Sequence, residues 1–172
     1  LSTYLKAEIH REGKIFVQEY SRGVPMAPVH VVGESDRTGT IITFKPDGEI
    51  FTASTEYSYS VLSARLRELA YLNKGVKLTL KDTRISVADQ AEEETPVEKY
   101  EEYFSEKGLL EFVTYLDGSN DKLTDAPIYL ETDRGGIPIE IAMQYNNGFR
   151  ENIHSYVNNI NTIEGGTHVA GF

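Results

Sequence analysis

Alternation of apolar and polar residues with a period of two is the feature that most limits how this chain can fold. It recurs in short runs at residues 5–10, 15–20, 40–44 and 76–81. Such runs are typical of strands that bury one face of a sheet. Turns that contain Gly or Pro separate them, as at 11–14 and 45–48. Because strands come in consecutive runs without strict helix alternation, the pattern predicts an α+β fold.

A helical period appears in a few places. Leu62, Leu66, Leu69 and Ala70 form one apolar stripe, which predicts a helix over 60–73, with Ser58 or Ser60 as its N-cap. A shorter helix is expected near 109–116, and a helix that Thr167 caps is expected at the end of the chain. Further strands are predicted at 97–105, 128–132, 137–145 and 152–158.

Composition excludes several classes of protein. The 172 residues contain no Cys, which rules out disulfides and thiolate metal sites. No apolar stretch reaches the roughly 18 residues of a membrane span, so we expect no membrane partner. The net charge of −10 makes the chain alone a poor nucleic-acid binder. Residues 88–107 carry −6 of that charge, and the stretch 82–96 is interpreted as a solvated surface loop.

Few residues are arranged for chemistry. The histidines share no metal-ligand spacing, and we expect no metal site; they are His10, His30, His154 and His168. A nucleophile elbow and a phosphate-binding P-loop are both missing from the sequence. The Gly-Gly-Thr at 165–167 could offer backbone N–H groups to an anion, or could be a flexible turn with a capping threonine.

The strand at 40–44 places Thr40, Ile42 and Phe44 on one face. A hydroxyl beside two apolar side chains suits an aromatic heterocycle, whose polar edge the hydroxyl can reach. The same pattern also suits plain sheet packing. The residues alone leave both interpretations open.

Motifs along most of the chain carry a resemblance. They are HREGKI at 10–15, TGT at 38–40, FKPD at 44–47, RLRELAYLNKGV at 65–76, NNGF at 146–149 and EGGTHVAGF at 164–172. In this order they resemble the gyrase B family, the ATPase subunits of bacterial DNA gyrase, a type IIA topoisomerase. Residues 83–97 stand outside the resemblance.

The resemblance implies an α+β fold in two parts. Residues 1–107 would be the C-terminal part of a Bergerat (GHKL-type) ATPase sandwich. Residues 108–172 would begin a transducer domain similar to the second domain of ribosomal protein S5. The chain would then be a fragment of the cytoplasmic ATPase subunit of gyrase. That enzyme uses ATP and Mg²⁺ to supercoil DNA negatively, and the partners of gyrase B are a second copy of itself, gyrase A and DNA.

The resemblance assigns few site residues to this chain. Thr40 and Ile42 would form a wall of the ATP pocket, and Arg11 would lie at its mouth, where aminocoumarin inhibitors make contact. The family's catalytic Glu-x-x-x-Asn segment, its adenine-binding Asp-x-Gly-x-Gly motif and its glycine-rich phosphate lid have no match here. We therefore expect no catalytic residue, no ATPase activity of the chain alone, and no cofactor bound to it.

One further expectation concerns the chain as a fragment. The sheet face that carries Thr40, Ile42 and Phe44 would lack its covering helices, so self-association or reduced stability is expected. The alternatives are a fragment of the corresponding ATPase subunit of topoisomerase IV, or a non-catalytic binding module of the same fold.

Overall fold

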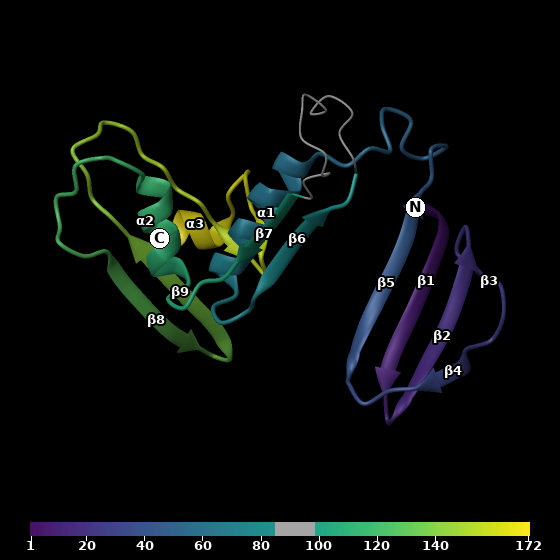
Figure 1. The fold of residues 1–172 in the computed structure, drawn as a ribbon. Coiled ribbons are helices and arrows are strands. Elements are labelled where there is room, and N and C mark those ends of the chain that lie inside the picture. Colours follow the sequence, from purple (N-terminus) through teal and green to yellow (C-terminus); the bar gives the residue numbers. More distant parts are fainter. Residues whose placement is uncertain (85–98) are drawn as a thin grey trace, which may run out of the picture. The chain divides into compact units, whose positions relative to one another are not determined.

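The computed structural model describes residues 1–84 and 99–172, and it confirms the predicted α+β fold (Figure 1). Two compact units are present, Leu1–Tyr57 and Ser58–Phe172. The domain boundary expected near residue 107 is a different division, implied by the family resemblance, and it stays a prediction. Most of the acidic loop predicted at 82–96 lies outside the described residues.

The first unit is an antiparallel sheet in the order β3-β2-β1-β5, with β4 also paired to β2. Its strands are β1 (Ser2–Arg11), β2 (Lys14–Ser21), β3 (Val24–Pro25), β4 (His30–Glu34) and β5 (Gly39–Pro46). The predicted hairpin over 4–20 is β1 and β2. Its two-residue turn has positive φ at both Glu12 (55°) and Gly13 (74°), the geometry that suits the twist of a hairpin.

The second unit contains three helices and three two-stranded sheets among its described residues. In chain order they are α1 (Tyr59–Leu72), β6 (Leu78–Asp82), β7 (Lys99–Tyr103), α2 (Leu109–Asp117), β8 (Ile128–Arg134), β9 (Ile137–Met143), β10 (Tyr156–Val157), β11 (Ile160–Asn161) and α3 (Thr167–Gly171). The pairs are β6–β7, β8–β9 and β10–β11.

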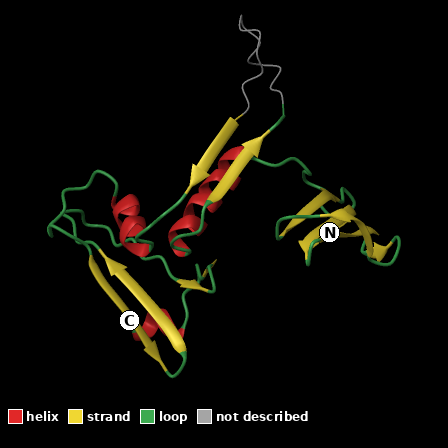
Figure 2. Cartoon of the chain, turned by 60° about the horizontal axis from the view of Figure 1, so that its bottom comes forward, coloured by secondary structure: helices red, strands yellow, loops and turns green. Residues whose placement is uncertain are grey.

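Aromatic packing holds the second unit together. Tyr71 of α1 stacks on Phe112 of α2, with ring centroids 5.2 Å apart, and Tyr156 of β10 lies 6.1 Å from the same Phe112 ring. α1 also packs against β6 and β7, as the red helix beside that strand pair shows in Figure 2. Ala70, near the C-terminal end of the apolar stripe of α1, is buried.

The structure tests the two helix N-caps predicted from the sequence. Ser58 caps α1 by accepting the Val61 N–H, as one of the two predicted candidates. The prediction that Thr167 caps the last helix is wrong, because the cap position is Gly166 and Thr167 is the first residue of α3.

The strand predicted at 152–158 is wrong over most of its length. Only Tyr156–Val157 is paired as a strand, and it ends there because Asn158 and Asn159 both take positive φ and turn the chain back into β11. In the described part of the chain, no helix has the length and apolar character to cross a membrane.

Candidate functional site

Strand pairing brings the predicted site residues to one face of the first sheet. Thr40 lies opposite Ile9, and Ile42 lies opposite Ala7, so each pair shares a face. Side chains alternate along β1, which places Arg11 on the face of Ile9. The structure therefore puts the three predicted residues Thr40, Ile42 and Arg11 on the same side of the sheet.

This face is apolar and exposed within its unit. The side chains of Ile42 and Phe44 are 52% and 54% exposed. Phe44 meets the ring of Tyr57 edge to face, with centroids 6.3 Å apart. A flat aromatic ligand could bury these apolar groups and still reach the Thr40 hydroxyl.

Arg11 ends β1, next to the hairpin turn. Its guanidinium is largely exposed and forms an ion pair with Glu12, with 3.1 Å between Nε and Oε1. An exposed ion pair of this kind stabilises little, so the guanidinium can exchange Glu12 for an anionic or polar ligand at low cost. The arrangement suits a contact at the rim of a site.

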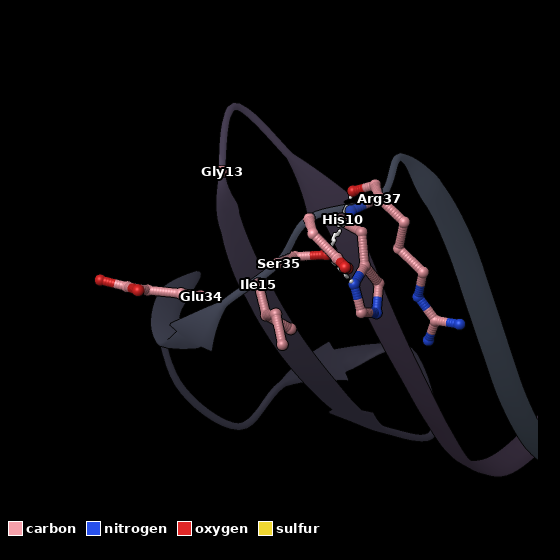
Figure 3. Close-up of a pocket in the computed structure, with 7 residues that line it drawn as sticks. His10, Gly13, Ile15, Glu34, Ser35 and Arg37 are labelled. Carbon is pink, nitrogen blue, oxygen red and sulfur yellow. Dashed lines mark hydrogen bonds between the residues drawn. The ribbon is translucent and has the colours of Figure 1, made fainter.

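The opposite face carries a chain of polar side chains that the sequence did not single out. His10 is only 6% exposed. Its Nδ1 lies 2.7 Å from Ser35 Oγ, and its Nε2 lies 3.0 Å from Glu8 Oε1. Lys6 donates to the other oxygen of Glu8 at 3.0 Å. Figure 3 shows the His10 ring and Ser35 turned toward each other, while Glu34 points away from them.

Hydrogen bonds from its neighbours keep the Glu8 side chain ionised. The bond from Lys6, and after it the bond from His10, lowers the pKa of Glu8 below its ordinary value. Glu8 is therefore a carboxylate at neutral pH and accepts from both neighbours. An open groove of about 540 Å³ adjoins these side chains; its lining residues are His10, Gly13, Ile15, Glu34, Ser35, Asp36 and Arg37.

Sequence reasoning missed the pairing of His10 with Ser35 because it joins a strand to a loop 25 residues away. One signal was present, since Lys6, Glu8 and His10 repeat polar residues on one face of a strand. Among the residues that the structure describes, no three His, Cys, Asp or Glu side chains are grouped so that they could hold a metal ion.

Comparison with known proteins gives consistent matches. The DNA gyrase B family model matches residues 108–172. Over all 172 residues the chain is 56% identical to the DNA gyrase B protein of Eisenibacter elegans, of which it covers 34%. It is 50% identical to the DNA gyrase B protein of Halalkalibacterium halodurans, of which it covers 25%. The chain thus spans about a third or less of these curated relatives.

A solved structure also matches. The ATPase domain of Thermus thermophilus gyrase B, in complex with an aminocoumarin, superimposes with a TM-score of 0.82 and 35% sequence identity. The match covers 99% of this chain and 43% of that one. Both described units therefore follow the fold of that domain.

Proposed function

We propose that this chain, which matches DNA gyrase B proteins along its whole length, is part of the ATP-driven subunit of a bacterial DNA gyrase. The observation that carries the proposal is the 56% identity to a gyrase B sequence over all 172 residues. The fold match to a gyrase B ATPase domain supports it independently.

In this proposal Thr40 and Ile42 form one wall of an ATP site. The exposed face of β5 fits the group, since it offers apolar side chains to the flat base and one hydroxyl to its polar edge. Arg11 lies at the rim, where its exposed guanidinium N–H groups can donate to a ligand. These residues bind and orient the base, and ATP supplies the reacting phosphates.

The chemistry of hydrolysis is proposed to come from outside these 172 residues. The sequence holds neither the Glu-x-x-x-Asn segment nor the Asp-x-Gly-x-Gly motif of the resembled family. Mg²⁺, which accompanies ATP in the resembled family, is proposed to bind in the full-length protein together with the nucleotide phosphates. The chain by itself is therefore proposed to be inactive.

The partners of the full-length protein are proposed to be a second copy of gyrase B, the A subunit of gyrase and DNA. With a net charge of −10, this chain is poorly suited to contact the phosphate backbone itself. Its role would be to bind nucleotide and to link that site to the transducer region at 108–172.

The test is a topology assay with the full-length protein and its partner gyrase A. Relaxed circular DNA and interlinked DNA circles are each incubated with the complex, with and without ATP. ATP-dependent negative supercoiling supports the proposal. Decatenation without supercoiling would point to topoisomerase IV instead. No change in either substrate, from a complex shown to assemble, would contradict an ATP-driven topoisomerase and favour a binding module.

A further inference from the structure

His10 lies behind the proposed nucleotide-binding wall, on the other face of the same sheet. It lies on the face opposite Thr40 and Ile42, and both its ring nitrogens have hydrogen-bond partners. A buried histidine with two partners is held in one orientation, since loss of either bond would leave a buried polar atom unsatisfied.

Ser35 joins this histidine to the loop between β4 and β5. Its backbone N–H donates to the Gly13 carbonyl at 3.0 Å, and its Oγ accepts the Arg37 N–H at 3.2 Å. The Arg37 bond lies within the loop, so two hydrogen bonds fix the loop to the β1–β2 hairpin: the one to Gly13 in the hairpin turn and the 2.7 Å contact to His10 Nδ1. The loop leads directly into Gly39, the first residue of β5.

The bond between His10 and Ser35 persists in either protonation state of the imidazole. Because Glu8 accepts from Nε2, a neutral ring has its Nδ1 free to accept the Ser35 hydroxyl proton. A protonated ring donates from Nδ1 instead, and the hydroxyl then donates to the Arg37 carbonyl 3.1 Å away. The connection does not depend on which form is present.

Thr40 lies near the N-terminal end of β5, the end that this loop holds. In the described part of the chain, β5 pairs along one edge only, with β1. Gly39 opposite His10 is the last pair of that ladder, and Thr40 opposite Ile9 is the next. Strand ends held on one side open most easily. Fixing the loop at Ser35 therefore holds the end of β5 that carries Thr40.

We infer that His10 and Ser35 are positioning residues for nucleotide binding, which hold Thr40 in place through the end of β5 without touching the nucleotide. The inference rests on the proposed function of Thr40 as part of an ATP-site wall.

The test uses the full-length protein and a non-hydrolysable ATP analogue. In Ser35→Ala and His10→Leu we expect the dissociation constant of the analogue and the KM for ATP to rise about fivefold, the factor of one net hydrogen bond. We expect kcat to stay within about twofold, because no group that reacts is changed. Ser35→Thr keeps the hydroxyl and should restore binding.

The matched control is His30→Leu. His30 is exposed on β4, with its Nδ1 3.1 Å from the Pro28 carbonyl, and its loss should leave nucleotide affinity unchanged. The inference is overturned if Ser35→Ala lowers the thermal unfolding midpoint while affinity stays unchanged, since the pair would then be merely structural. It is also overturned if Ser35→Thr binds as weakly as Ser35→Ala.

Thr40→Val separates this inference from the proposed function. If Thr40→Val weakens binding of the analogue and Ser35→Ala does not, the positioning role fails while the proposed wall stands. If neither variant weakens binding, the proposed wall fails together with the inference.

Discussion

Glu101 on β7 is held by side chains of two elements. Its Oε2 accepts from the Tyr103 hydroxyl at 2.5 Å and from Ser63 Oγ at 3.2 Å, and Arg67 Nη2 lies 3.6 Å away. The Tyr103 hydrogen bond is the largest cause that lowers the pKa of Glu101 below its ordinary value of 4.5. The carboxylate therefore joins the helix α1 to the strand β7.

A pH-dependent contribution to stability follows at this residue. A carboxyl whose pKa is lower in the folded state stabilises the fold above its ordinary value, and the contribution is lost as the pH falls through the folded pKa. Glu101→Gln should lower the thermal unfolding midpoint of the chain at pH 7, with a gap to wild type that closes as the pH falls below 4.5. Glu106→Gln, at an exposed position, is the control. A gap that stays the same across this pH range would contradict the assignment.

At the scale of elements, the β10–β11 hairpin depends on α1. Tyr156 donates to Glu68 Oε1 at 2.5 Å, and Asn159 Nδ2 donates to Asn73 Oδ1 at 2.9 Å. Arg65 Nη2 also donates to the Asn159 carbonyl at 2.8 Å. A two-stranded hairpin is marginal alone in water, so these bonds, together with the packing of Tyr156 against Phe112, order it.

Tyr156→Phe removes one of these bonds and leaves the ring in place. We expect amide hydrogen exchange of the hairpin in the full-length protein to speed up about fivefold, as for the loss of about 1 kcal/mol. Tyr129→Phe is the control, because its hydroxyl bonds only to Glu131 and Glu140 on β8 and β9 in the described structure. Equal exchange in Tyr156→Phe and wild type would show that the hairpin is ordered by other contacts.

The elements also show what a sequence can predict. Period-two runs predicted β1, β2, β5 and β6, because the alternation of buried and exposed side chains along a strand is a local property of the sequence. The shared face of Thr40 and Ile42 followed from the same alternation. The end of β10 could not be predicted from this alternation. It depends on the turn, in which two successive asparagines take positive φ. The His10–Ser35 bond was also out of reach, because it depends on where a distant loop folds.

At the scale of the whole molecule, an exposed apolar sheet face and a large net charge have opposite effects on self-association. Ile42 and Phe44 are about half exposed on the proposed nucleotide face, while the chain carries a net charge of −10. Exposed apolar surface favours association, and like charge opposes it over about 10 Å at 0.1 M salt.

The 172-residue chain alone should therefore self-associate, and more strongly as salt is raised. Sedimentation velocity over a range of protein and salt concentrations measures this. The double variant Ile42→Ser with Phe44→Ser should shift the chain toward monomer, whereas Phe149→Ser, at an exposed position elsewhere, should not. A wild-type chain that stays monomeric at all concentrations and salts would contradict the prediction.

The central claim is that the face of β5 is a wall of an ATP site, and one pair of variants tests it most directly. Thr40 and Thr43 lie on the same exposed strand but on opposite faces, opposite Ile9 and Lys6. The measurement is the affinity of the full-length protein for a non-hydrolysable ATP analogue. We predict that Thr40→Val weakens binding about fivefold, as the loss of one net hydrogen bond, and that Thr43→Val leaves it unchanged. Equal affinity in both variants and wild type would contradict the claim.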